Sequence, residues 1–420
     1  MNSELRRQAL GGWCIWNTAR RNFVRQLSHS KCCFGNLPRE YIQAEPSIDD
    51  EIVVAMSSGV DSSVCAALYA QKFPKVRGVY MANWTQSAKC LESDWKDVQR
   101  VCSQVGIPCE RLNFEKEYWH DVFQPMIQGY EKGLTPNPDL QCNRHIKFGL
   151  LVEYMRRKFG DLHNWWLVTG HYARIMMHKP SGEYHLLRGY SNQKDQAYYL
   201  ANVSSSIFPK ILMPIGHMEK PDVRKIAEKY NLTTAKKPDS QGLCFVSQEN
   251  RHFRDFLNEF IPPNPGNIIT EDGTVWGRHQ GLWHGTIGQR LGISMPQGDH
   301  KYKGVWFVSE KRLSSNEIVI VKGSNNEKLF QNCLKVMRWH WINGEPNELK
   351  ILLASQQITL QYRSLQEPAL VKALKSLSDD TCHIELNEKV KAMAPGQNIV
   401  LYRGERILGA GILAKTYNYM

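Results

Sequence analysis

The sequence lacks several features that would each point to a particular class of protein. Its 420 residues contain no apolar run of about 18 residues, so no membrane-spanning helix is expected. The GxxxxGK(S/T) motif is missing, which excludes an ordinary P-loop nucleotide-binding protein. The 11 cysteines form no CxxC pair and no short-spaced cysteine–histidine cluster, which argues against a structural zinc site and a disulfide framework. No low-complexity tract or internal repeat occurs.

Acidic residues are fewer than basic ones. The chain has 53 lysines and arginines against 41 acids, a formal net charge of +12, which favours an anionic partner, nucleic acid above all. Acids are scarcest near the N-terminus, where arginines alternate with aromatic and aliphatic residues at helical spacing. Such a basic amphipathic leader is typical of a mitochondrial transit peptide, so residues 1–45 are predicted to direct the protein to the mitochondrial matrix. A basic arm that binds nucleic acid is the alternative.

Short β-branched runs alternate with helical patterns through the first half of the chain. We expect strands over 51–56, 76–83, 109–113 and 165–169, and helices over 61–72, 91–105 and 146–159. This order predicts an α/β fold with a doubly wound parallel sheet that binds its ligand at the carboxyl ends of the strands. The predicted domains are a catalytic domain over 46–210, a small central domain over 211–280 and a C-terminal β-barrel over 281–420.

The segment "VVAMSSGVDSSVCAAL", which begins at Val53, places small polar residues between a strand and a helix. The free N–H groups and the dipole of a helix N-terminus attract anions, and Ser57, Ser58 and Gly59 would let a phosphate approach the backbone. Asp61 is a candidate to cap the helix or to hold a Mg²⁺ ion beside the phosphates. A plain capped helix after a strand is the alternative interpretation.

Two cysteines lie in basic surroundings. Cys142 ends the proline-stiffened run "GLTPNPDLQC", and Arg144, His145 and Lys147 follow it, positive groups that would lower the pKa of the thiol. Cys244 lies in "KKPDSQGLCFV", again close to lysines and beside a glycine. Either cysteine alone would be interpreted as an inert buried thiol, but the two together indicate thiol chemistry.

These motifs together resemble those of the tRNA-specific 2-thiouridylases of bacteria and mitochondria, members of the N-type ATP pyrophosphatase superfamily. Other matching segments follow in the family's order: "VYMANW" (79–84), "TGHYAR" (169–174), "KDQAYYL" (194–200), "TIGQRLGI" (286–293) and "APGQNIVLYRGERILGAGIL" (394–413). The family's loop reads SGGxDS, so Ser58 replaces its first glycine. We expect this replacement to require a negative φ at Ser58.

The resemblance implies a set of binding residues. Those expected to hold ATP are Ala55, Met56, Ser57, Ser58, Gly59, Val60, Asp61, Ser62, Met81 and Gly170. Those expected to meet the target base or the rest of the tRNA are Asn137, Pro138, Asp139, His171, Lys194, Asp195, Gln196, Gln361, Tyr362, Arg363 and Gln397. The family has an Arg-Tyr pair where this chain has Gln361-Tyr362, and the neighbouring Arg363 is the candidate to replace that arginine.

The resemblance also implies a reaction. ATP, with Mg²⁺, would adenylate the C2 oxygen of the wobble uridine in tRNAs for lysine, glutamate and glutamine. Cys244 would carry a persulfide sulfur from a donor protein, Cys142 would release it by closing a disulfide or act as a nucleophile, and Asp139 would serve as general acid or base. The alternatives are another adenylating tRNA-modifying enzyme on the same fold and a non-catalytic basic RNA-binding protein.

Overall fold

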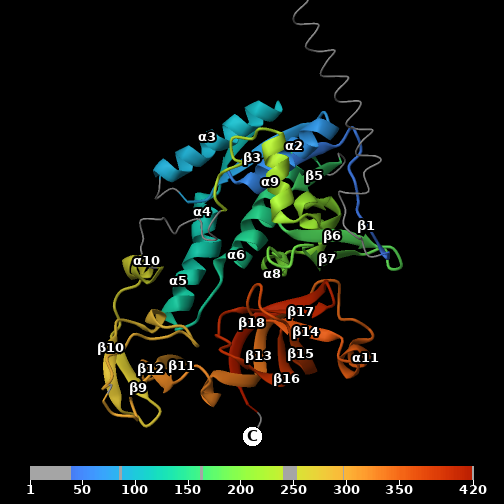
Figure 1. Cartoon of the computed structure of the whole chain (residues 1–420). Helices are drawn as coiled ribbons and strands as arrows, with labels where there is room; N and C mark the ends of the chain where they lie inside the picture. The colour runs from blue at the N-terminus through green and yellow to red at the C-terminus, as the bar shows by residue number, and fades with distance from the viewer. Residues whose placement is uncertain (1–38, 85–87, 161–163, 240–252, 297, 419–420) are drawn as a thin grey trace, which may run out of the picture.

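The computed structural model describes residues 39–84, 88–160, 164–239, 253–296 and 298–418, and the side chains of 88–90 are left out. The predicted transit segment up to residue 38, and Cys244, lie outside these ranges. Figure 1 shows the catalytic region above a β-barrel, with a smaller sheet beside the barrel. No helix in the described part is both long and apolar enough to cross a membrane.

The catalytic region contains a five-stranded sheet in the order β4-β3-β2-β5-β8, and every pair is parallel. Its strands are β2 (Glu51–Met56), β3 (Val76–Ala82), β4 (Cys109–Asn113), β5 (Trp165–Val168) and β8 (Ile211–Leu212). The predicted strands are thus confirmed, and the order reverses between β2 and β5. The carboxyl ends of these two neighbouring strands form the crevice in which doubly wound sheets bind ligands.

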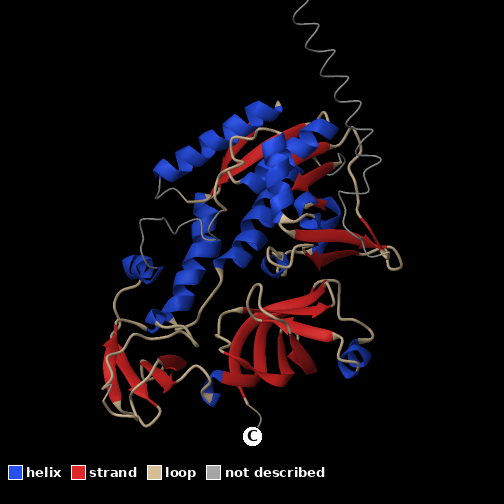
Figure 2. Cartoon of the chain, in the orientation of Figure 1, coloured by secondary structure: helices blue, strands red, loops and turns tan. Residues whose placement is uncertain are grey.

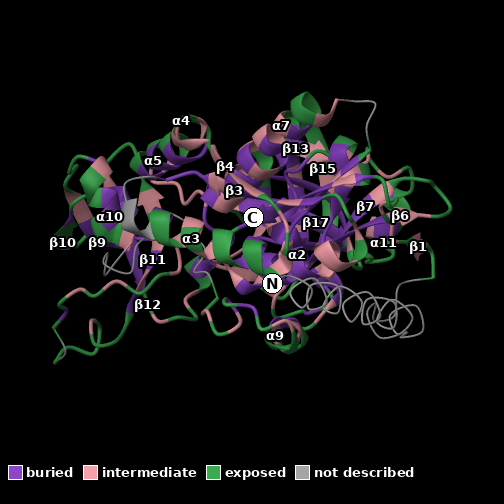
Figure 3. Ribbon diagram, turned by 90° about the horizontal axis from the view of Figure 1, so that it is seen from above, coloured by how far each residue is buried: buried purple, intermediate pink, exposed green. Residues whose placement is uncertain are grey.

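Both faces of this sheet are covered by helices (Figure 2). Alternation along β2 explains why: Ile52 and Val54 pack on one side, and Val53 and Ala55 on the other. The first face holds α2 (Val60–Lys72), α3 (Ala88–Val105) and α9 (Lys220–Lys229). The second face holds α6 (Pro138–Gln141), the π-helix η2 (Cys142–Leu150), α7 (Leu151–Phe159) and α8 (Ala197–Leu200). Exposed and buried residues alternate along α3 and α9, as Figure 3 shows from above, so each of these helices has a solvent face and a buried face.

The remaining elements of the catalytic region are short. They are α4 (Glu115–Tyr118), the π-helix η1 (Trp119–Phe123), α5 (Gln124–Glu131), and the 3₁₀-helices η3 (Ser205–Lys210) and η4 (Pro214–His217). The segment predicted as one helix from residue 146 begins earlier, at Pro138, and runs through α6, η2 and α7. The wider turns of η2 follow directly on Cys142.

The central region has a four-stranded sheet in the order β10-β9-β12-β11. Its elements are α10 (Phe253–Phe260), β9 (Gly266–Thr270), β10 (Val275–His279), η5 (Leu282–His284), β11 (Trp306–Arg312) and β12 (Glu317–Lys322). This sheet pairs β9 with β12 in parallel, so the domain boundary that we placed at residue 280 falls inside one sheet. Short runs of alternating residues give no signal for such a long-range pairing.

The C-terminal barrel confirms the predicted architecture. Its elements are η6 (Glu327–Leu329), β13 (Phe330–Trp341), α11 (Leu349–Ala354), β14 (Ile358–Gln361), β15 (Ala369–Ser378), β16 (Thr381–Lys391), β17 (Asn398–Arg403) and β18 (Arg406–Tyr417). The barrel closes because β18 pairs with both β13 and β17. A single register pair, Arg406 with Leu187, joins it to β7 (Tyr184–Arg188), which continues into β6 (Ala173–His178) and β1 (Tyr41–Ile42).

Candidate active site

The turn from β2 to α2 is the first half of the candidate site, and we call residues 57–62 the nucleotide loop. Gly59 is the N-cap of α2, and no side chain caps the helix there. Asp61, proposed above as a cap, has another role. The Ser57 amide donates to Ser62 Oγ at 3.1 Å within the loop. Ser57 is exposed, whereas Ala55 and Met56 are buried in the sheet, so these last two would offer only backbone to a nucleotide.

Ser58 differs from our expectation, because its φ is +61° and not negative. The reversal from strand to helix requires a left-handed residue at this point, a conformation that costs a non-glycine residue about 1–2 kcal/mol. Two hydrogen bonds hold the side chain: the Ser58 hydroxyl donates to Asp94 at 2.6 Å and accepts from the Lys237 ammonium at 3.0 Å. Lys237 also pairs with Asp94 at 3.0 Å and with Asp97 at 2.9 Å.

Asp61 is held by an ion pair across the domain. Both of its carboxylate oxygens accept from the Lys220 ammonium at 2.8 Å, and the Tyr172 hydroxyl donates to Oδ1 at 2.8 Å. The same ammonium lies 3.0 Å from Asp239, whose pKa is lowered to about 2 because its hydrogen bonds and charge contacts with lysines outweigh burial. A Mg²⁺ ion on Asp61 would have to displace Lys220. Among the described residues no group of three or more His, Cys, Asp and Glu could hold a metal.

Sequence reasoning missed Lys220, although a signal was present. The residue occupies the first position of α9, where the positive end of the helix dipole disfavours a cation. A lysine in that position that is nearly buried needs an acidic partner, and here the partners are Asp61 and Asp239.

Gly170 lies beside the nucleotide loop, two residues after the end of β5. A Cβ atom there would be 2.9 Å from the Ser62 amide nitrogen and 3.1 Å from the Asp61 carbonyl carbon, too close for any side chain. The backbone after β5 therefore packs on the first turn of α2, as expected from parallel neighbours whose carboxyl ends meet. Met81, which was also expected to hold ATP, is half-buried near the end of β3.

Residues 133–142, which we call the reacting loop, form the second half of the site. The Asn137 side chain caps α6 by accepting from the Asp139 amide at 3.0 Å, and Pro138 follows the cap, a combination that starts a helix sharply. Burial raises the pKa of the Asp139 carboxyl, and the charge of Lys147 partly offsets this. Cys142 is only 5% exposed, in an apolar cluster that also holds Trp84.

Lys147 connects the reacting loop to the region of the nucleotide loop. Its charge acts on Asp139, and it also acts on His171, the residue after Gly170. Burial, with a further contribution from Lys147, lowers the pKa of His171 well below its usual value, so this ring is neutral at pH 7. His171 Nδ1 lies 2.9 Å from Thr169 Oγ1, which fixes the ring. The Phe148 ring of η2 lies 5.6 Å from the His171 ring, so η2 packs against the chain that follows β5. Arg144, expected near the thiol, is exposed.

The residues predicted to contact tRNA in the 194–196 segment differ in their surroundings. Lys194 is at the surface and pairs with Asp239 at 2.9 Å. Asp195 is buried and accepts from Arg188 at 3.1 Å and from two backbone amides. The Gln196 side chain accepts from the Tyr172 amide at 2.9 Å. Of these three predicted tRNA contacts, only Lys194 presents its charge at the surface.

Of the four barrel residues that were expected to meet tRNA, Gln361 and Tyr362 are buried, Gln397 is half-buried and Arg363 is exposed. Gln361 accepts from the same Arg188 at 3.0 Å, and Tyr362 donates to the Lys391 carbonyl at 3.1 Å. Arg363 donates to the Ala392 carbonyl at 2.5 Å. Gln397 donates from Nε2 to the Thr135 carbonyl at 2.5 Å, inside the reacting loop. The tRNA contacts of these residues remain predictions.

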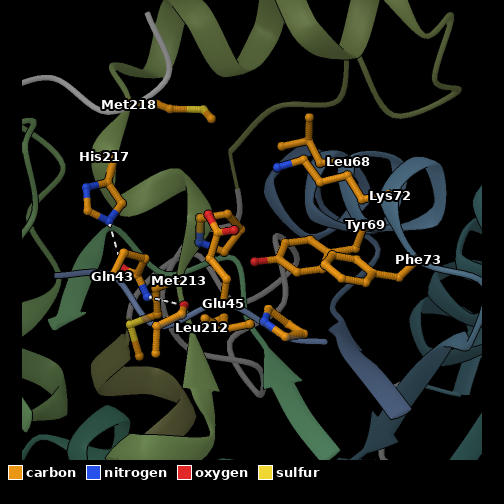
Figure 4. A pocket seen from close by; sticks show the side chains of 13 residues that line it. Gln43, Glu45, Leu68, Tyr69, Lys72, Phe73, Leu212, Met213, His217 and Met218 are labelled. Carbon is orange, nitrogen blue, oxygen red and sulfur yellow. Dashed lines mark hydrogen bonds between the residues drawn. The ribbon is translucent and has the colours of Figure 1, made fainter. Parts of the chain in front are cut away.

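A separate cavity of about 170 Å³ lies at the other end of α2 (Figure 4). Residues 43–46, the last turns of α2 and residues 212–218 line it. His217, whose pKa burial lowers to about 4, faces Gln43 there at 3.2 Å. The cavity shares no residue with the nucleotide loop or the reacting loop, so it is no part of the candidate active site.

The fold and the loop after β2 define an ATP pyrophosphatase-type domain, followed by a small central domain and a closed β-barrel. Three family descriptions match along the chain: "tRNA methyl transferase HUP domain" over residues 50–248, "tRNA methyl transferase PRC-barrel domain" over 254–322 and "Aminomethyltransferase beta-barrel domain" over 331–413. Use of ATP follows from the first of these folds.

Similar proteins extend over nearly the whole chain. Mitochondrial tRNA-specific 2-thiouridylase 1 of Saccharomyces cerevisiae is 45% identical over 394 residues, 90% of this chain and 94% of that protein. tRNA-specific 2-thiouridylase MnmA of Lactiplantibacillus plantarum is 40% identical over 371 residues, 87% of this chain and 96% of that protein. The chain therefore belongs to the tRNA-specific 2-thiouridylase family, a family of sulfurtransferases that act on tRNA.

Proposed function

We propose that this protein uses ATP to replace the C2 oxygen of the wobble uridine with sulfur in tRNAs for lysine, glutamate and glutamine. One structural observation carries the proposal: α6 and η2, the elements of Asp139 and Cys142, pack beside β5, since Leu140 shares an apolar cluster with Leu167 and the Phe148 ring lies 5.6 Å from the His171 ring. The names of the relatives supply the substrate class, and the +12 net charge suits an anionic RNA.

The chemistry explains why both halves of the site are needed. The C2 oxygen is a poor leaving group, so in the first step it attacks the α-phosphorus of ATP and pyrophosphate leaves. The N–H groups at the start of α2 are placed to bind the negative charge of the phosphates. In the second step sulfur attacks C2, and the oxygen leaves with AMP.

Cys142 and Cys244 would deliver the sulfur. A persulfide on Cys244, supplied by a donor protein, has its inner sulfur attacked by the Cys142 thiolate. A disulfide forms between the two cysteines and the outer sulfur is released as hydrosulfide, which attacks C2; an external thiol later reduces the disulfide. Asp139, whose burial raises its pKa, can hold or give the proton that moves at the base.

The proposed reaction includes no step that depends on a metal ion bound by Asp61. Both oxygens of Asp61, the residue predicted to hold Mg²⁺, accept hydrogen bonds from Lys220, so the donor set does not fit the ion. Within the described ranges, Lys220 and Lys237 are positive groups that contact the nucleotide loop.

Location follows from the relatives. The S. cerevisiae protein is named as mitochondrial, which supports a mitochondrial location for this chain. Residence in the matrix, where mitochondrial tRNA is found, would agree with the basic leader.

The test is a reconstituted reaction. The full chain is incubated with ATP, sulfide as sulfur source and unmodified tRNA, and AMP and thiolated tRNA are measured, the latter by its retardation on a mercury-containing gel. Both products are expected. AMP without thiolated tRNA would favour another adenylating enzyme of this fold, and neither product would favour a non-catalytic RNA-binding protein.

A further inference from the structure

The reacting loop belongs to the catalytic region, but side chains of the central domain and of the barrel hold its backbone. From the central domain, the Lys311 ammonium on β11 donates to the Gly133 carbonyl at 2.9 Å. Gly133 has a φ of +69°, and a Cβ atom there would lie 3.2 Å from Leu282, which belongs to the central domain, as Lys311 does. The beginning of the loop is thus fixed against the central domain.

The barrel holds the next residues. Gln397 Nε2 donates to the Thr135 carbonyl at 2.5 Å, and the Thr135 amide donates to the Pro395 carbonyl at 2.8 Å. Between these two contacts Gly396 has a φ of +96°, and a Cβ atom there would be 2.7 Å from the Thr135 nitrogen. Both the N–H and the C=O group of Thr135 therefore bind the barrel. The close approach of Thr135 to Gly396 requires a glycine at that position.

The held segment leads directly into the chemistry. Asn137 begins α6 two residues after Thr135, and Asp139 and Cys142 follow within the next turns. Pro136 and Pro138 stiffen the connection, so a displacement at Thr135 is transmitted to α6 and is not absorbed between them. The contacts with Lys311 and Gln397 consequently fix where the start of α6 lies.

Lys311 places a charged ammonium group where an uncharged side chain would be expected for a purely structural contact. Burial lowers its pKa to about 8, which means that the fold spends free energy to keep an ammonium in this place. An apolar residue would fill the same space without that cost, but it would leave the Gly133 carbonyl unbound.

We propose that Lys311 and Gln397 are positioning residues for the reaction, which hold the backbone at Gly133 and Thr135 so that Asp139 and Cys142 meet the activated uridine. The central domain and the barrel thereby set the geometry of a loop that belongs to the catalytic domain. This inference rests on the proposed function for its kinetic part, whereas its structural part can be tested without any activity.

The kinetic test uses Lys311→Met and Gln397→Glu in the full chain. The second change keeps the side chain's shape but puts an oxygen in place of the donor nitrogen. Both variants are expected to lower kcat for tRNA thiolation about tenfold or more, because small displacements of reacting groups are costly, with KM for tRNA within about threefold of the original. Lys311→Arg, which keeps a donor, should recover a large part of kcat.

Matched controls come from side chains that also donate to backbone carbonyls, away from the loop. Lys322 donates to the His300 carbonyl at 2.6 Å, and Gln331 to the Lys328 carbonyl at 3.1 Å. Lys322→Met and Gln331→Glu should leave kcat unchanged. If Gln397→Glu raised KM for tRNA with an unchanged kcat, Gln397 would be a tRNA contact and the proposal would be wrong, as it would be if the controls lost as much kcat as the test variants.

Amide hydrogen exchange separates this inference from the proposed function. A peptide spanning residues 129–142 should exchange faster in Lys311→Met and Gln397→Glu than in the unchanged chain and in both controls. If the unchanged protein did not thiolate tRNA but the two variants still exchanged faster, the positioning of the reacting loop by Lys311 and Gln397 would be upheld and the proposed function refuted. Equal exchange in all variants would refute the positioning, whatever the activity.

Discussion

The nucleotide loop and the reacting loop reach their conformations in different ways. The nucleotide loop is built between a strand and a helix that are adjacent in sequence, and its contacts with Ser58 and Asp61 come from the same catalytic domain. The reacting loop depends on side chains from two further domains, Lys311 and Gln397. Under the proposed function, ATP binding would be a property of one domain, whereas sulfur transfer would require the assembled chain.

The largest expected effect is in the reacting loop. Cys142→Ser should lower thiolation by about a thousandfold or more, because a hydroxyl can neither attack a persulfide nor close a disulfide. The rate of 2-thiouridine formation with a persulfide-carrying donor protein, measured on a mercury gel, tests this, because free sulfide would bypass both thiols. Cys109→Ser, at a half-buried thiol on β4, is the control and should keep its activity. Comparable activity of the Cys142 and Cys109 variants would remove Cys142 from the mechanism.

The next effect is in the nucleotide loop. Gly170→Ala would place a methyl group 2.9 Å from the Ser62 nitrogen, so the first turn of α2 must shift. We expect KM for ATP to rise about tenfold or more, since backbone donors would leave their positions. Gly292→Ala, at a glycine with open space around it, should leave KM for ATP unchanged. A normal KM for ATP in the Gly170 variant would place the nucleotide elsewhere.

A smaller effect concerns pH and the connection between the two loops. The charge of Lys147 lowers the pKa of Asp139 against the larger effect of burial. Lys147→Met removes this contribution, so the pKa of Asp139 should rise and the limb of the pH–rate profile that Asp139 controls should move to higher pH. If Asp139 acts as a base, the acid limb of the pH–rate profile moves, and if it acts as an acid, the alkaline limb moves. The measurement is kcat against pH for the unchanged protein and for Lys147→Met. Coincident profiles would show that Asp139 does not control the rate.

The smallest expected effect separates strain from hydrogen bonding at Ser58. Ser58→Ala and Ser58→Gly both lose the bonds to Asp94 and Lys237, but only glycine adopts a φ of +61° without strain. The glycine variant should therefore be more stable to urea than the alanine variant by about 1 kcal/mol. Equal stability would mean that the loop relaxes in both variants.

The local parts of the fold could be predicted from the sequence. β2 has the predicted bounds, and α2 begins one residue before the predicted start, because apolar runs and small turn residues act between neighbours in the chain. The region around Asp139 was singled out by its prolines and its cysteine, and its reactivity stays a prediction. The pairing of β9 with β12 was not predictable, since it joins strands far apart in sequence, and the boundary placed at residue 280 was therefore misplaced.

The sequence by itself determined the family and the kinds of fold along the chain, because those depend on residue types at fixed spacing, whereas the roles of the site residues stay predictions. Only the tertiary structure decided the partners of Asp61, the positive φ of Ser58 and the hold of Lys311 and Gln397 on the reacting loop. The physical reason is that a buried charge or a backbone carbonyl takes whichever donor the packing brings within about 3 Å, and no local pattern specifies that donor.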